Sequence, residues 1–175
     1  SPCFRCGAFD GYPCLTNGKA DAQVMCIEPT LAHHPNVTLL TGAYVRQLDT
    51  DASGLAVTAV QVERTGVRET YRADIVVVAC GALSSALLLL RSANARHPNG
   101  VANGSDRLGR NYIRHNQSVL LAITREPNET VFQKTVALSD FYFGADDSPH
   151  PLGLIQMTGK SHADTLRGES LPAWL

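Results

Sequence analysis

The sequence predicts an α/β fold, which is α+β within the 175 residues present. One observation is an uninterrupted apolar segment at residues 75–79, which Gly81 separates from a second apolar run at 87–90. The other is a series of short β-rich segments between residues 37 and 71, separated by polar turns. The first pattern indicates a buried parallel strand that leads into a helix, and the second indicates a β-meander.

Length and charge exclude several classes of protein. Hydrophobic residues make up 44% of the chain, as in ordinary globular proteins. The formal net charge of −1 leaves no basic excess for a nucleic-acid surface. The uncharged run at residues 75–90 is shorter than the ~20 residues of a membrane span. No secretory signal is visible, so we expect a cytoplasmic protein. Membrane association through a partner is left open.

Five cysteines occur at irregular spacing, which favours a reducing compartment over a disulfide framework. Cys3 and Cys6 form a C-x-x-C motif, and Cys14 follows in FDGYPC. Three thiolates hold zinc or an iron–sulfur cluster only with a fourth ligand, and no second C-x-x-C or histidine pair accompanies them. We therefore expect a loop without metal. A small metal-stabilised binding module built on these three cysteines is the alternative.

The first predicted helix covers residues 19–34. An apolar stripe recurs there with helical spacing, at Ala20, Val24, Ile27 and Leu31. Pro29 interrupts this pattern, and proline is tolerated in the first turn of a helix. We therefore expect one helix to end near Glu28 and a further turn to begin at Pro29.

Four short strands are predicted next, over residues 37–41, 43–48, 55–63 and 67–71. Gly42 separates the first two, and the polar clusters at 49–54 and 65–66 provide the later turns. In the third strand, the apolar face is predicted to comprise Leu55, Val57, Ala59 and, after a change of phase at Val60, Val62.

The strand at 75–79 and the helix after it form the central unit of the chain. Ser84 and Ser85 are predicted to cap the helix. A strand, a turn of small residues and a helix are typical of dinucleotide-binding units, whose ligands lie at the carboxyl ends of strands. At Gly81 and Ala82 the side chains are small enough for a cofactor to approach the backbone. A buried β-turn-α unit without a ligand is the alternative.

The C-terminal third begins with a polar connection at residues 96–105. Strands are predicted at 119–124, within 132–143 and at 152–157, with polar turns between them.

Several segments, taken in order, resemble the central region of the glucose–methanol–choline (GMC) oxidoreductases, which include choline dehydrogenase-like flavoproteins. They are NVTLLT at 36–41, AYV at 43–45, ADIVVVACGA at 73–82 and LSS at 83–85. The segment at 107–115 resembles the family's G-x-N-x-x-x-H pattern. The chain departs from the family at Ala86, where proline is frequent, and at Cys80, where we expect a buried and inert thiol.

The resemblance implies that residues 1–106 are the central part of an FAD-binding Rossmann-like domain with an inserted β-meander. Residues 107–175 would begin an antiparallel substrate-binding sheet. The residue matching Val45 holds the adenine of FAD through its backbone in this family. The turn at Cys80, Gly81 and Ala82 lies against the cofactor. Asn111 and His115 become candidates for the vicinity of the active site.

The implied function is oxidation of the CH–OH group of an alcohol, sugar or polyol by hydride transfer to FAD. The substrate would be a small-molecule alcohol, and the electron acceptor is left open among oxygen, a quinone and a cytochrome. Another two-dinucleotide flavoprotein, fumarate-reductase-like or ketosteroid-dehydrogenase-like, is the alternative. No G-x-G-x-x-G motif occurs in these residues. We therefore expect an internal piece of a longer protein, inactive alone, whose catalytic base is C-terminal to it.

Overall fold

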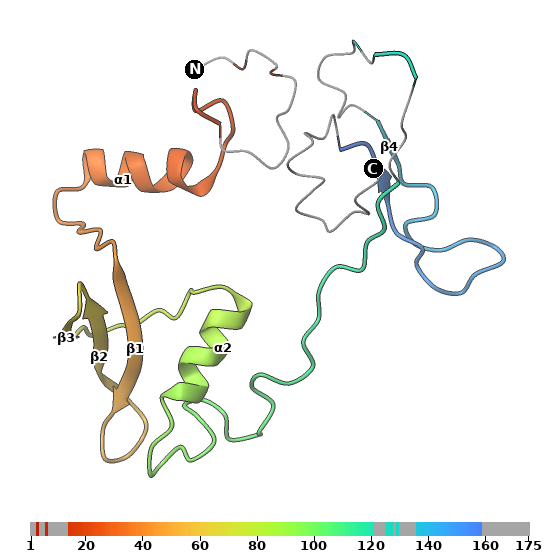
Figure 1. Cartoon of the computed structure of the whole chain (residues 1–175). Coiled ribbons are helices and arrows are strands. Elements are labelled where there is room, and N and C mark those ends of the chain that lie inside the picture. Colours follow the sequence, from red (N-terminus) through yellow and green to blue (C-terminus); the bar gives the residue numbers. More distant parts are fainter. Residues whose placement is uncertain are drawn as a thin grey trace. The chain divides into compact units, whose positions relative to one another are not determined.

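The computed structural model describes Cys3, Cys6 and residues 14–120, 125–127, 129 and 136–158. Helices and antiparallel strands are mixed in it, which confirms the α+β class (Figure 1). Contacts divide the chain into two compact units, one of residues Thr38–Val119 and the other of Ser1–Val37 with Leu120–Leu175. No helix in the described ranges has the length and apolar character needed to cross a membrane.

The unit Thr38–Val119 contains an antiparallel sheet with strand order β1-β2-β3. Its strands are β1 (Ala43–Thr50), β2 (Val57–Arg64) and β3 (Val67–Tyr71). Three of the four predicted strands of the meander are therefore confirmed. Ala59 and Val62, both on the predicted apolar face of β2, are buried, whereas Leu55 lies in the preceding loop and is 90% exposed.

Turn chemistry explains both hairpins. In the β1–β2 loop, one carboxylate oxygen of Asp51 accepts hydrogen bonds from the Ser53 hydroxyl at 2.8 Å and the Leu55 N–H at 3.0 Å. Between β2 and β3, Thr65 and Gly66 both have positive φ, 50° and 80°. A two-residue turn with positive φ at both positions matches the right-handed twist of the flanking strands. The predicted turn at Thr65-Gly66 is thus confirmed.

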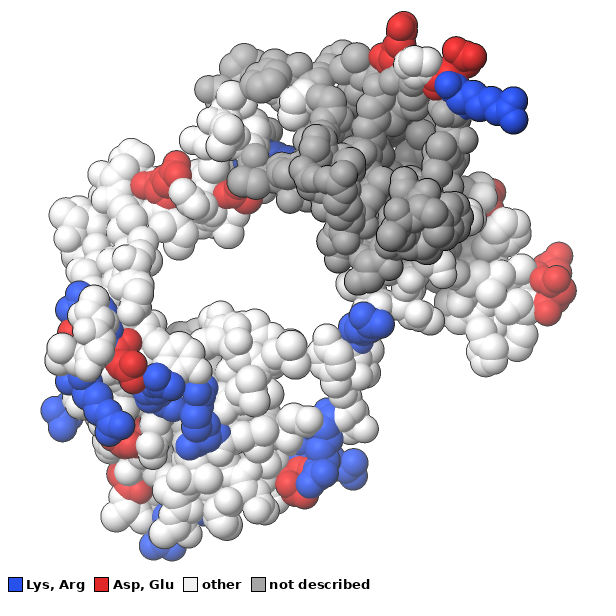
Figure 2. All heavy atoms as spheres, in the orientation of Figure 1, with Lys and Arg blue, Asp and Glu red and all other residues white. Residues whose placement is uncertain are grey.

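The helix α2 (Ala82–Arg91) packs against β1, and Figure 1 shows it beside the sheet. The buried apolar side chains of this unit come from the sheet and the helix, and are Leu48, Ala59, Val62 and Leu88. Basic and acidic side chains are interspersed over the sheet (Figure 2), where Arg46 pairs with Glu63 at 2.8 Å.

The predicted serine cap of α2 is wrong. The N-cap is Gly81, and no side chain caps the helix. Ser85 lies in the first turn, where its hydroxyl accepts the Cys80 N–H at 3.0 Å. The chain turns one residue before Ala82 because Gly81 adopts φ 78° and ψ 166°, a conformation open essentially to glycine alone.

The predicted buried strand at residues 75–79 is also wrong. The segment has no assigned strand, and no other described segment pairs with it. Ile75 and Val77 are 80% and 78% exposed. A strand exists only with a hydrogen-bonded neighbour, so an apolar pattern alone does not produce one. The predicted strand at 37–41 is absent for the same reason, although 43–50 forms β1 directly after it.

The described residues of the other unit include two helical segments. A π-helical turn, η1 (Gln23–Ile27), leads directly into α1 (Glu28–His33), which has Pro29 in its first turn. The predicted helix at 19–34 is therefore present as a shorter one. The predicted break near Glu28 is absent; instead, the π-helical turn ends at Ile27 and the α-helix begins at Glu28. Asp21 begins the turn by accepting the Val24 N–H at 2.9 Å.

The described C-terminal residues form one short antiparallel ladder, in which β4 (Ala137–Leu138) pairs with β5 (Ile155–Gln156). This agrees with strands predicted within 132–143 and 152–157, although both are much shorter than expected. Of the predicted strand at 119–124, residues 119 and 120 are not in a strand, and the rest lie outside the described residues.

Candidate functional site

The turn before α2 leaves its main chain open to approach. A Cβ placed on Gly81 would meet nothing within 4 Å. The first helical hydrogen bond runs from the Ser85 N–H to the Gly81 carbonyl at 2.9 Å. A group approaching Gly81 would therefore reach main-chain atoms without displacing a side chain of the described chain.

The N–H groups of the first turn of α2 add hydrogen-bond donors to this turn. Those of Ala82, Leu83 and Ser84 precede the first helical hydrogen bond, and no side chain caps them. Such groups carry partial positive charge and favour acceptor or anionic ligands. Cys80, Gly81, Ala82, Leu83 and Ser84 are all exposed, so the predicted buried state of the Cys80 thiol is wrong.

Val45 lies on β1, where it pairs with Val62 of β2. The register shifts between Val45 and Gln47, which leaves Arg46 in a β-bulge. Bulges re-aim groups along a strand and are frequent beside active sites. In the sheet that the structure describes, β1 is an edge strand, so main-chain groups on its outer side have no strand partner.

The neighbour of Val45, Tyr44, is held by two arginines. The Arg91 guanidinium donates to the Tyr44 hydroxyl at 2.6 Å, and that of Arg46 lies 4.4 Å from the ring centroid. The hydrogen bond from Arg91 lowers the pKa of Tyr44 below its ordinary value. These contacts tie the start of β1 to the last turn of α2.

The other two predicted site residues do not join this cluster. Asn111 and His115 are exposed and lie in irregular chain. Asn111 has a left-handed backbone, with φ 56°. Among the described residues, no hydrogen bond connects the side chain of Asn111 or His115, or Val45, to the turn at 80–82.

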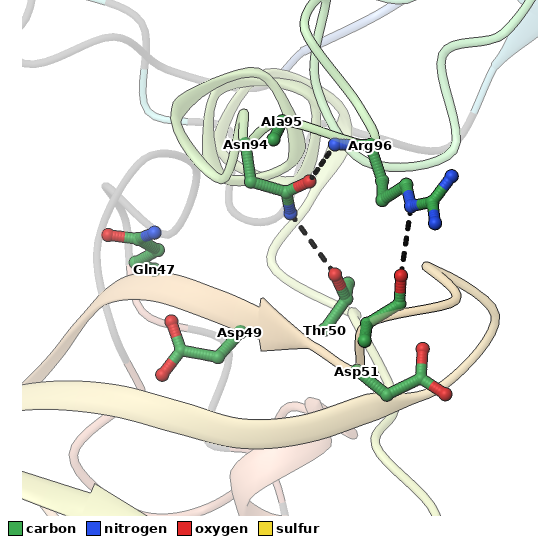
Figure 3. A pocket seen from close by; sticks show the side chains of 8 residues that line it. Gln47, Asp49, Thr50, Asp51, Asn94, Ala95 and Arg96 are labelled. Atoms are coloured by element: carbon green, nitrogen blue, oxygen red, sulfur yellow. Dashed lines mark hydrogen bonds between the residues drawn. The ribbon is translucent and has the colours of Figure 1, made fainter.

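A polar pocket that sequence reasoning missed lies at the other end of α2 (Figure 3). Its volume is about 460 Å³, and its lining comes from the end of β1, the following loop and the chain after α2. Asn94 donates to the Thr50 hydroxyl at 3.1 Å, and Arg96 to the Ala52 carbonyl at 2.9 Å. These two hydrogen bonds join the end of β1 and the β1–β2 loop to the chain after α2. In the sequence, the one indication of this pocket is the polar turn cluster at residues 49–54, part of which lines it.

The candidate metal ligands do not converge. In the part of the chain that the structure describes, which includes Cys3, Cys6 and Cys14, no group of three His, Cys, Asp or Glu side chains could hold a metal ion.

Comparison with protein families matches residues 1–117 to the family described as GMC oxidoreductase. Among individual proteins, the chain is 31% identical to paromamine 6'-oxidase of Streptomyces fradiae over 98% of its own length and 33% of that protein. It is 35% identical to 6'''-hydroxyparomomycin C oxidase of Streptomyces lividus over 82% of its length and 28% of that protein.

A further relative is 2-methyl-1,2-propanediol dehydrogenase of Mycolicibacterium austroafricanum, 36% identical over 55% of this chain and 18% of that protein. No solved structure matches significantly. The chain spans about a third or less of the length of these relatives.

Proposed function

This chain belongs to the GMC oxidoreductase family, and on that premise we propose that it is part of an FAD-dependent enzyme that oxidises the CH–OH group of a small-molecule alcohol. Family membership sets aside the fumarate-reductase-like and ketosteroid-dehydrogenase-like alternatives. The cofactor and substrate are inferred from the turn before α2 and from the chemistry that the relatives' names describe.

The observation that carries the proposal is the backbone at Gly81. Its φ of 78° and ψ of 166° turn the chain into α2, and the space where a side chain would lie is open. The N–H groups of Ala82 and Leu83 are free of helical acceptors. This arrangement fits a ligand that is flat or bears acceptor atoms, and FAD has both properties.

Four residues would hold parts of the FAD. Cys80, Gly81 and Ala82 would lie against it through their main chain, because their small side chains leave the backbone accessible. Val45 would contact the adenine through its main-chain N–H and C=O, beside the bulge in edge strand β1. Tyr44 fixes this part of β1 through the Arg91 hydrogen bond.

The flavin, when bound, supplies the acceptor for the hydride that leaves the alcohol carbon. The residues of this chain would position the cofactor and shield it from water. Asn111 and His115 would offer polar side chains near the substrate, and the group that takes the hydroxyl proton would lie C-terminal to residue 175.

The substrate class follows from the relatives. Their names describe oxidation of paromamine at the 6' position and of 2-methyl-1,2-propanediol. We therefore propose a sugar or polyol hydroxyl as the reacting group. Because two relatives are named oxidases and one a dehydrogenase, the acceptor is to be determined by experiment.

The test is anaerobic mixing of the purified intact protein with paromamine, 2-methyl-1,2-propanediol or simple polyols. Loss of flavin absorbance on addition of one of these alcohols, but not of the matching aldehyde or acid, is expected. Admission of oxygen, or of a quinone-like dye, then identifies the acceptor by recovery of the absorbance. An intact protein that lacks flavin, or whose flavin no alcohol reduces, would refute the proposal.

A further inference from the structure

The N-terminal cysteines play no part in the proposed FAD site, yet the structure holds one of them in a defined loop. The Gly18 N–H donates to the Cys14 sulfur at 3.2 Å, and the Thr16 hydroxyl lies 3.5 Å from it. Asn17 has φ 53°, and its N–H donates to the Cys14 carbonyl at 3.3 Å. The loop thus folds its main chain around one sulfur atom.

A second cysteine, Cys3, also lies beside Gly18. A Cβ built on Gly18 would be 3.5 Å from the Cys14 sulfur and 3.6 Å from the Cys3 Cβ. Both cysteine side chains therefore border the small space that the missing glycine side chain leaves. A disulfide needs its two Cβ atoms about 4 Å apart. The main chain sets that distance, so closure of the pair requires the loop to bring the Cβ atoms of Cys3 and Cys14 this close.

The surroundings of Cys14 favour its reactive form. A hydrogen bond from Thr16, then the backbone N–H groups of Thr16 and Gly18, lower the pKa of the Cys14 thiol from its ordinary 9.0 to about 7. The thiolate is the nucleophile in reactions with peroxides and disulfides, so Cys14 is activated at neutral pH. It is also partly exposed.

We propose that Cys14 and Cys3 form a peroxide-sensitive thiol pair that closes into a disulfide across Gly18. Cys3 and Cys14 are both thiols in the structure. The structure therefore shows this pair in its reduced form. The inference rests on the loop geometry and on the surroundings of Cys14, and it is independent of the proposed FAD function.

The oxidant is a peroxide such as hydrogen peroxide. The Cys14 thiolate attacks a peroxide oxygen, an S–O bond forms, and the O–O bond breaks with release of hydroxide, which takes a proton to become water. The Cys3 thiolate then attacks the Cys14 sulfur, an S–S bond forms, and the S–O bond breaks with loss of a second hydroxide. Two thiols and one peroxide thus give one disulfide and two waters.

The pairing with Cys3 is favoured over two other outcomes. Cys6 shares the C-x-x-C motif with Cys3, but among the described residues the atoms nearest to a Cβ on Gly18 belong to Cys14 and Cys3. A metal held by the cysteines would need at least three converging ligands, and the described residues contain no such group.

The test is oxidation of the intact protein with hydrogen peroxide at neutral pH, followed by alkylation and peptide mapping without reductant. A peptide pair joined through Cys3 and Cys14 is expected, and a reductant should separate it. Cys3→Ser should leave Cys14 as a sulfenic acid that dimedone labels. Cys26→Ser, which removes an exposed cysteine of η1, should not change the cross-link.

Two results would overturn the proposal. One is a Cys3–Cys6 or intermolecular disulfide in place of Cys3–Cys14. The other is a Cys14 that peroxide oxidises no faster than Cys26 in the folded wild-type protein, because the loop would then give Cys14 no special reactivity. The wild-type comparison needs no variant to fold.

Discussion

The buried Ser92 hydroxyl accepts a hydrogen bond from the Leu48 N–H at 2.9 Å and donates one to the Leu88 carbonyl at 2.7 Å. Leu48 is 2% exposed and Ser92 is fully buried. The first bond joins the middle of β1 to the end of α2. Because α2 is rigid, this bond fixes where its other end, with Gly81, lies relative to the sheet.

We predict that Ser92→Ala lowers the free energy of unfolding of the intact protein by about 1–3 kcal/mol, because the buried Leu48 N–H loses its acceptor. Urea unfolding measures this change. Ser84→Ala is the matched control, since Ser84 is exposed near the other end of α2, and it should change the value by less than about 0.5 kcal/mol. Equal midpoints for the two variants would contradict the structural role of Ser92.

Thr65→Asn should stabilise the β2–β3 hairpin by up to about 1 kcal/mol. Thr65 is β-branched and has φ 50°, a left-handed conformation that asparagine tolerates far better. Thermal unfolding of the two proteins provides the comparison. Thr70→Asn, on exposed β3, should instead leave stability unchanged or lower it, because asparagine disfavours strands. A destabilised Thr65→Asn protein would argue against this turn geometry.

Alkylation of Cys14 should have a pH midpoint near 7. Because the folded-state pKa is lowered, this group adds to stability above the ordinary value of 9.0 and ceases to do so as the pH falls through about 7. Thr16→Val removes the largest cause of the shift and should move the midpoint upward. Rates measured by mass spectrometry between pH 5 and 10 give both midpoints. An unmoved midpoint would show that Thr16 does not set this pKa.

The 175-residue chain expressed alone should bind FAD weakly and tend to aggregate. Ile75 and Val77 are 80% and 78% exposed, and the outer edge of β1 has no strand partner among the described residues. Exposed apolar segments and open edges promote association between chains. Light scattering and the absorbance spectrum of the purified chain, compared with the intact protein, make the test. A monodisperse and yellow chain would contradict this expectation.

Local sequence patterns are sufficient to predict the β-meander. Strands β1, β2 and β3 follow from β-rich segments and from turns such as Thr65-Gly66, and the helix α1 follows from its apolar stripe. These elements depend on contacts between residues close in sequence. The predicted burial of Ala59 and Val62 is confirmed as well.

The prediction failed where an element needs a distant partner. Residues 75–79 have the composition of a buried strand, yet nothing described pairs with them. Ser84 and Ser85 predict a side-chain cap at the start of α2, whereas the backbone conformation of Gly81 sets where this helix begins. The pocket between β1 and the chain after α2 comes from the contacts of Asn94 and Arg96, which no local pattern encodes.

Whether Val45, Asn111 and His115 belong to the FAD and substrate sites stays a prediction, because their roles come from the family resemblance. The proposed FAD site depends most on Gly81, because its backbone conformation and open surroundings are the features that fit a cofactor.

The most direct test is the FAD-to-protein ratio of the intact protein, of Gly81→Ala and of Gly104→Ala. Gly104 has nothing within 4 Å of an added Cβ and no positive φ, so its replacement controls for the loss of a glycine as such. We predict stoichiometric FAD in the wild type and Gly104→Ala, and a large loss in Gly81→Ala when all three are folded. A wild type without FAD, or a folded Gly81→Ala protein that retains it fully, would contradict the claim that this turn holds the cofactor.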